Sequence, residues 1–266
     1  MSQWFSASFF HKPNGHPVDL VDLYAGGSLF LVLNGPSFDE RQRILLTPRS
    51  GIVTMGTNNG AHAYRPDLWT CVDDPRRFMS SIWQDPKIAK FVPLEQFSRP
   101  CSTGQPVGTM PHVIGYRRND HFRPDWWLWE PTINWGNSKE RGGGRSVMLV
   151  ALRLAWLLGF RRVYLVGCDF DMDSERGYWF PEQRTNQAVA NNRNSYRIMQ
   201  GYFASLRPHF DAAGFQVLNC NPDSKLEAFD HADLRESIIR EASRLDLDAT
   251  TEGMYVPHPP LHPKRP

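Results

Sequence analysis

Polar and small residues follow several apolar runs of this 266-residue chain, at points where β-strands would end. Glycine lets backbone amides approach a phosphate, Ser and Asn can bind a ribose or a base, and a helix start favours an anion. Because ligands of open α/β sheets bind outside the carboxyl ends of the strands, these turns would meet at one edge. Each turn alone is more typical of an ordinary loop, but together they predict a nucleotide cleft. The turns are Asn34-Gly35-Pro36-Ser37, Gly56-Thr57-Asn58-Asn59-Gly60, Asp73-Asp74-Pro75 and Gly167-Cys168-Asp169-Phe170-Asp171-Met172-Asp173.

The last of these turns contains three aspartates at alternate positions, Asp169, Asp171 and Asp173. In an extended segment alternate residues face the same way, so the three carboxylates could converge. Carboxylates spaced in this manner can hold Mg²⁺ or Mn²⁺ against a diphosphate, with Asp171 and Asp173 as the metal ligands. The alternative is that Asp169 braces a neighbouring loop while the other two carboxylates are solvated.

A segment rich in tryptophan, at 116–145, supplies further candidates. Its His121 could act as a general base toward an acceptor hydroxyl. Arg141 and Arg145 flank a run of three glycines before an apolar helix, where a guanidinium and the helix N-terminus could together bind phosphate oxygens. An ordinary salt bridge is an equally good interpretation of either arginine.

The composition indicates a globular protein with a sizeable core, because 41% of the residues are hydrophobic and 22% are charged. A net charge of +2 gives no general reason to expect nucleic acid or an anionic membrane as partner. The four scattered cysteines form neither a metal motif nor a secreted disulfide framework. The apolar segment at 147–160 is too short to span a bilayer, and the N-terminus does not resemble a signal peptide. We therefore expect a cytoplasmic protein without a membrane span.

Short apolar runs alternate with helical patterns, which predicts an α/β fold with a mainly parallel sheet and helices on both faces. The pattern favours one domain over 1–250, a Trp-rich lid or acceptor loop at 116–145, and an extended or disordered tail at 251–266. Pro208 should bend or end the third predicted helix. Strands are predicted at 29–33, 52–55, 68–72, 112–116, 163–166 and 215–218, and helices at 75–83, 144–158, 194–210 and 232–245.

Several motifs in the same order resemble those of the bacterial lipooligosaccharide sialyltransferases and the related archaeal hydroxymethylpterin diphosphokinase-like proteins. The chain is also similar to phage proteins assigned to the glycosyltransferases of that superfamily. The likeness covers roughly residues 28 to 240, and each motif is short. The motifs are NGPSF, TNNG, VDDP, GGGRSVMLVALRLAWLLGFRRVYLVGCDF and FQVLNCNPDSKLEAF.

The resemblance implies a Rossmann-like glycosyltransferase fold with defined donor-binding positions. The sialyltransferases use a His before the third helix as base, whereas this chain has Asn191 and Asn192 in that region. Replacement bases are Asp169, Asp171, Glu175, Glu182 and His121. By position, the donor nucleotide would contact Asn34, Gly35, Ser37, Asn58 or Asn59, Asp74, Arg145, Ser146, Asn221 and Ser224.

These expectations lead to a glycosyltransferase that moves a sugar from a nucleotide-activated donor to a hydroxyl. The acidic turns favour a metal-assisted UDP-sugar or GDP-sugar, and the phage likeness suggests a hydroxymethylated pyrimidine in DNA as acceptor. A mouth of the cleft lined by basic and aromatic side chains would bind such an acceptor. Two alternatives stay open, a diphosphokinase acting on a pterin-like alcohol with ATP and Mg²⁺, and a non-catalytic nucleotide or nucleic-acid binding module. The mouth would comprise Arg117, Arg118, Arg123, Trp126, Trp127, Arg141 and Arg145.

Overall fold

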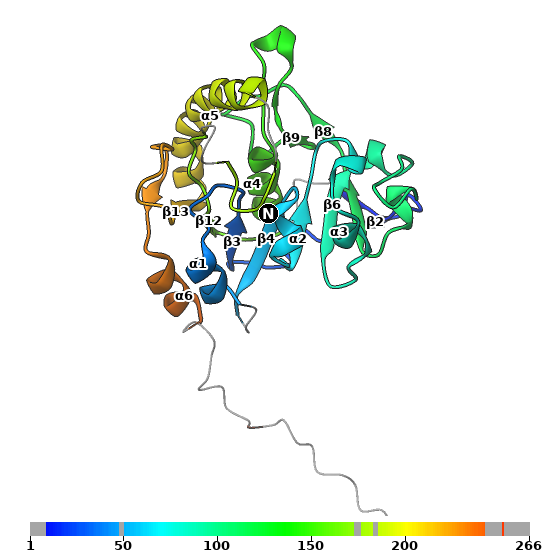
Figure 1. Cartoon of the computed structure of the whole chain (residues 1–266), viewed down its shortest axis with the longest axis horizontal. Coiled ribbons are helices and arrows are strands. Elements are labelled where there is room, and N and C mark those ends of the chain that lie inside the picture. The colour runs from blue at the N-terminus through cyan, green and yellow to red at the C-terminus, as the bar shows by residue number, and fades with distance from the viewer. Residues whose placement is uncertain (1–8, 48–50, 173–176, 183–185, 243–251, 253–266) are drawn as a thin grey trace, which may run out of the picture.

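A computed structural model of the chain describes residues 9–47, 51–172, 177–182, 186–242 and 252. Its centre is a ten-stranded sheet in the order β14-β13-β12-β3-β4-β5-β6-β7-β1-β2 (Figure 1). Every pairing from β14 to β7 is parallel, and β1 joins β7 and β2 antiparallel. The strands are β1 Phe10–His11, β2 Pro17–Val18, β3 Ser28–Val32, β4 Val53–Thr57, β5 Leu68–Thr70, β6 Ala89–Pro93, β7 Val113–Tyr116, β12 Arg162–Val166, β13 Gln216–Asn219 and β14 Asp230–His231.

Helices connect these strands, which confirms the predicted α/β class and mainly parallel sheet and is compatible with a Rossmann-like fold. No helix among the described residues is both long and apolar enough to cross a bilayer. The predicted tail lies outside the described residues except for Glu252. The helices are α1 Glu40–Leu45, α2 Gly60–Ala63, α3 Ser80–Gln84, α4 Val147–Leu157, α5 Asn186–Ala212 and α6 Leu234–Ala242, with short 3₁₀ turns η1 Pro75–Arg77, η2 Leu94–Gln96, η3 Val107–Thr109 and η4 Lys139–Arg141.

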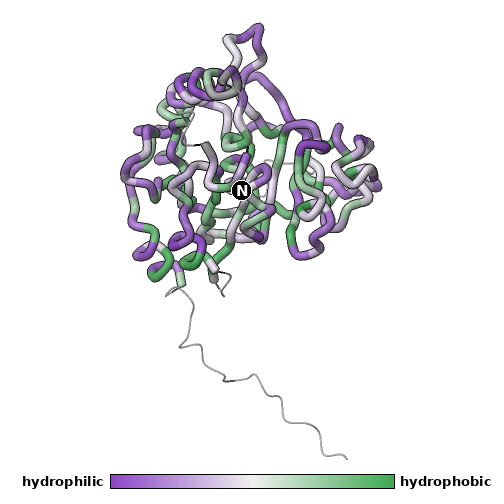
Figure 2. Tube along the Cα trace, viewed as in Figure 1, coloured by the Kyte–Doolittle hydropathy of each residue, from purple (hydrophilic) through white to green (hydrophobic). Residues whose placement is uncertain are grey.

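Successive residues of the central strands bury their side chains in different parts of the core. Leu29 and Leu31 of β3 join the cluster that contains α4 and the buried side of α5, whereas Phe30 and Val32 join the cluster next to α1 and α6. This follows from the alternation of side chains along a strand, and it explains why the strands read as continuous apolar runs. Figure 2 shows the hydrophobic residues concentrated along the sheet.

Helix α5 extends beyond its predicted bounds of 194–210, from Asn186 to Ala212, and Pro208 does not end it. Proline cannot donate the backbone hydrogen bond of a helix interior, so it was expected to bend or end the helix. Pro208 lies in the last turns, and the fully buried side chains of Leu206 and Phe210 hold this end of α5 against the core. Tertiary packing therefore outweighs the local preference.

The middle of the segment predicted as a lid is anchored to α4. Trp127 is fully buried, Leu128 O accepts a hydrogen bond from Trp156 Nε1 at 3.1 Å, and Glu130 O accepts one from Arg153 Nη2 at 2.6 Å. This part of the segment therefore belongs to the core. The segment also carries two small ribbons, formed by β8 Arg118–Asn119 with β9 Ile133–Asn134, and by β10 Gly136–Asn137 with β11 Gly144–Arg145.

The order of the strands reverses beside β3. The chain leaves β3 through α1 to β4 on one side, and later returns through α4 to β12 on the other side. The chain therefore leaves β3 and β12 toward opposite faces of the sheet, and the carboxyl edge at such a reversal is where doubly wound sheets bind ligands.

Strand β6 was missed by the sequence prediction, because Lys90 interrupts a short apolar run. The Lys90 side chain is fully buried, and its ammonium donates to three carbonyl oxygens, Asp85 O at 2.7 Å, Ile88 O at 3.0 Å and Pro111 O at 2.9 Å. It thereby ties the loops before β6 and β7 together. Burial lowers the pKa of Lys90 from 10.5 to about 8.

The lowered pKa of Lys90 predicts a pH dependence of stability. Between pH 8 and 10.5 the unfolded chain holds more protons than the folded chain, so the free energy of unfolding rises with pH. Relative to Lys90→Met, the wild type should gain about 2 kcal/mol between roughly pH 7.5 and 9.5, measured by urea unfolding. The contributions of other titrating groups are the same in both proteins and cancel when the two free energies of unfolding are subtracted. A difference that stays constant would mean that Lys90 keeps its ordinary pKa, and a difference that falls would mean that folding raises the pKa.

Candidate functional site

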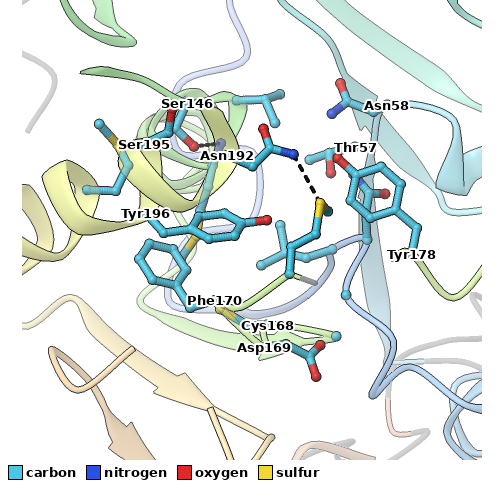
Figure 3. Close-up of a pocket in the computed structure, with 18 of the residues that line it drawn as sticks. Thr57, Asn58, Ser146, Cys168, Asp169, Phe170, Tyr178, Asn192, Ser195 and Tyr196 are labelled. Carbon is cyan, nitrogen blue, oxygen red and sulfur yellow. Dashed lines mark hydrogen bonds between the residues drawn. The ribbon is translucent and has the colours of Figure 1, made fainter. Parts of the chain in front are cut away.

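A cleft of about 560 Å³ opens where β3, β4 and β12 end and α4 begins (Figure 3). Helix α5 forms one wall through Asn192, Ser195 and Tyr196, and the turn after β12 forms another. The structure brings together, in this cleft, a subset of the residues that the sequence singled out. They are Asn34, Gly35, Asn58, Arg145, Ser146, Asp169 and Asp171.

Asp169 holds three loops together at the floor of the cleft. Its Oδ2 accepts hydrogen bonds from Ser37 Oγ at 2.8 Å and Ser37 N at 3.2 Å, and its Oδ1 accepts one from Asn221 Nδ2 at 3.2 Å. The Ser224 hydroxyl donates to Asp169 O at 3.3 Å. Burial raises the pKa of the Asp169 carboxyl, and the bonds from Ser37 act in the opposite direction. Ser37, Asn221 and Ser224 therefore lie behind Asp169, outside the cleft lining, and Asp169 acts as a brace.

Gly35 allows the close approach of this carboxylate. A Cβ atom at Gly35 would overlap Asp169 Oδ2 and lie 2.6 Å from Gly167 O. The Gly35 amide also donates to Gly167 O at 2.9 Å, which joins the loops after β3 and β12. The glycine is thus required for contact between the two loops.

Asn59 and Asp74 lie outside the cleft lining and organise the turn around η1. The Asn59 side chain donates to Arg77 O and accepts from Met79 N, each at 3.0 Å. Asp74 caps η1 by accepting from Arg76 N at 3.0 Å, and its contact with the Arg76 guanidinium keeps the pKa of Asp74 well below its usual range. The neighbouring Asp73 lines the cleft instead.

Arg145 and Ser146 stand at the N-terminus of α4. The Ser146 hydroxyl accepts from Met148 N at 3.1 Å and caps the helix. The Arg145 guanidinium stacks on the Trp135 ring at 4.6 Å from its centroid and pairs with Asp120 Oδ2 at 2.6 Å. Arg118 stacks on the same ring at 4.2 Å. The salt-bridge interpretation of Arg145 is therefore correct, and the pairing also holds this cation at the rim of the cleft.

His121 is exposed and does not line the cleft. Its backbone N–H donates to Asn119 Oδ1 at 3.1 Å. The acidic residue beside it, Asp120, is the one that pairs with Arg145. Its position gives no geometric support for the predicted role as base.

Three residues that line the cleft each carry a buried side-chain oxygen without a hydrogen-bond partner among the described residues: Asn34 Oδ1, Thr57 Oγ1 and Asn58 Oδ1. Thr57 is only 1% exposed, and Asn58 adopts a left-handed backbone with φ of 52°. Buried polar atoms without partners are costly, so several at one place indicate a ligand that supplies donors. Sequence reasoning quoted Thr57 within its turn without assigning it a role, because nothing local shows that its hydroxyl is unpartnered.

Aromatic side chains also line the cleft. Phe170 has a left-handed backbone with φ of 57°, and its ring lies 4.9 Å from that of Tyr196 (Figure 3). Tyr178 lines the same space. Asn191 and Asn192, which stand where the resemblance expects a His, also line the cleft.

The predicted metal site is only partly described. Asp173 and Glu175 lie outside the described residues, and Asp171 is exposed at the cleft, where its Oδ1 accepts from Met172 N at 2.8 Å. The part of the chain that is described holds no group of three or more His, Cys, Asp or Glu arranged to bind a metal. Since Asp169 is already engaged by three donors, Asp171 alone does not make a Mg²⁺ or Mn²⁺ site, and that site stays a prediction.

Comparison of the chain with protein-family models, curated proteins and solved structures returned no match.

Gly35→Ala tests the contact between the Asp169 brace and the β3 loop. The added methyl group should lower the free energy of unfolding by about 1 to 3 kcal/mol, because it overlaps backbone and carboxylate atoms. Gly201→Ala, on the exposed side of α5 with open space around it, is the matched control and should gain about 0.5 to 1 kcal/mol. Urea unfolding measures both. Equal stability of Gly35→Ala and wild type would show that the carboxylate is free to move aside.

Proposed function

We propose that the protein is a glycosyltransferase that binds a nucleotide-activated sugar in this cleft and transfers the sugar to a hydroxyl group. The observation that carries the proposal is the group of unpartnered oxygens of Asn34, Thr57 and Asn58 at the strand-order reversal. Amide and hydroxyl oxygens there would accept from ribose hydroxyls and from N–H groups of a base. The finer assignment of the sheet, a Rossmann-like glycosyltransferase fold, is part of this proposal.

The charges around the cleft suit the phosphate of such a donor. Arg145 is held at the rim by Trp135 and Asp120, and the N-terminus of α4 opens beside it. A fixed guanidinium and a helix N-terminus both favour an anion. The flat rings of Phe170, Tyr178 and Tyr196 offer apolar surface to a base or a sugar.

Asp171 is the best-placed general base. Unlike Asp169, it is exposed at the cleft and takes no hydrogen bond from another loop of the described chain. The acceptor hydroxyl would lose its proton to Asp171 and form a bond to the anomeric carbon. The bond from that carbon to the phosphate oxygen would break, and the nucleotide would leave with the electron pair.

A thermal-shift panel tests the proposal with CMP, UDP, GDP and ATP, each with and without Mn²⁺. A bound nucleotide at about 100 times its Kd should raise Tm by about 5 to 10 °C. Thr57→Val should weaken the binding of that nucleotide about tenfold. The control is Thr54→Val, because the Thr54 hydroxyl donates to Asp67 at 2.8 Å. This control should lower the stability of the protein and leave nucleotide binding unchanged. Stabilisation by ATP alone would favour the diphosphokinase. No stabilisation by any nucleotide would refute both enzymes.

Asp171→Asn tests the base. Hydrolysis of the sugar nucleotide, with water as surrogate acceptor, should fall about 10²- to 10⁴-fold while the thermal shift by the nucleotide is retained. Asp73→Asn removes another carboxylate of the same cleft and should change the rate only a few-fold. If both variants lose activity equally, the effect is general electrostatics, and Asp171 is not the base.

A further inference from the structure

A groove of about 480 Å³ adjoins the cleft and shares three of its residues, Phe170, Asp171 and Tyr196. The remaining lining comes from one side of α5 and from the turn after β13. It consists of Arg193, Arg197, Gln200, Lys225 and Glu227. The proposed base, Asp171, thus stands at the junction of the two spaces.

The three cations of this groove form no ion pair with any residue that the structure describes. Among the described residues, no carboxylate lies within 4.0 Å of the charged atoms of Arg193, Arg197 or Lys225, although Asp171 and Glu227 line the same groove. Arg193 Nε donates to Met172 O at 2.8 Å, and Arg197 Nη2 donates to Asn194 Oδ1 at 3.1 Å, and both of these acceptors are uncharged.

The arginines of the Trp-rich segment behave differently. Arg123 pairs with Glu130 at 3.6 Å, and both Arg141 and Arg145 pair with Asp120, at 3.8 Å and 2.6 Å. Arg118 pairs with Glu95. Four of the five arginines of the basic mouth expected from the sequence are therefore paired with carboxylates, whereas Arg193, Arg197 and Lys225 of the groove form no ion pair among the described residues.

We propose that this groove is the acceptor subsite and that it binds phosphate groups of the acceptor. The inference rests on the proposed function, because it assigns the second substrate of the same site. Arg193 and Arg197 are one helical turn apart, roughly 6 Å, and guanidinium groups bind phosphate oxygens in a bidentate manner. The phosphates could belong to a polynucleotide or to a small phosphorylated molecule, and the experiment separates these sources.

The test uses two probes on the full chain with the cleft filled by the nucleotide that the thermal-shift panel identifies. A fluorescein-labelled thymidine decamer represents a polynucleotide and is followed by anisotropy. Inorganic pyrophosphate represents a small phosphorylated acceptor and is followed by calorimetry. The groove variant is Arg197→Glu with Lys225→Glu, which leaves the Arg193 bond to Met172 intact.

The matched control is Lys12→Glu with Lys87→Glu. Both lysines are exposed and line a different pocket, near the amino ends of β6 and β7. The control changes the net charge of the protein by the same amount as the groove variant. If the probe binds the two variants with different affinity, the difference is therefore due to where the charges lie and not to the net charge.

For a polynucleotide acceptor, the decamer should bind the groove variant at least tenfold more weakly than the control. The slope of log K against log salt, taken between about 50 and 200 mM, should fall by about 1.4, for two phosphate contacts at roughly 0.7 each. If only pyrophosphate binds, and the groove variant alone loses it, the acceptor is a small phosphorylated molecule.

Equal affinity of both variants for both probes, or no binding of either probe to the wild type, would overturn the inference. The nucleotide-induced thermal shift is measured separately and would still support the proposed function in that case. A missing thermal shift refutes the proposed function instead, so the two failures are distinguishable.

Discussion

The carboxylate of Asp169 is the contact on which the geometry of the cleft depends. It follows β12, accepts from Ser37 after β3 and from Asn221 after β13, and packs against a glycine where no other residue fits. Three parallel strands are thereby joined at their carboxyl ends. Together with the Gly35 N–H bond to Gly167 O, this contact fixes the loops that carry Asn34 and Asp171 relative to each other.

Burying a carboxylate in this position is unfavourable, and the three hydrogen bonds offset that cost. The turn is further constrained by left-handed backbone at Gly167 and Phe170. For a bulky residue such as Phe170 this conformation costs about 1 to 2 kcal/mol, and packing against Tyr196 and Phe203 holds it in place. In this turn the Asp169 carboxylate is hydrogen-bonded to the neighbouring loops, while Asp171 stays exposed.

The arginines around the cleft differ in whether they have an acidic partner. Four arginines between β7 and α4 pair with acidic residues of their own segment or of η2, whereas Arg193 and Arg197 of α5 line the groove with no ion pair in the described chain. Arg145 lies at the boundary, since it is paired with Asp120 and still borders the cleft. The described chain thus offers a cation paired with Asp120 near α4, and cations without an ion pair along the adjoining groove.

The sequence by itself determined the α/β class, the main strands and the edge at which their polar turns meet, because apolar runs and turn residues are local signals and parallel strands share one carboxyl edge. Only the tertiary structure decided that Asp73 lines the cleft and Asp74 does not, that Ser37 lies behind Asp169, and that β6 contains a buried Lys90. Each of these depends on contacts between residues distant in the chain. Side-chain spacing along one segment carries no information about which remote donor or carboxylate will lie opposite.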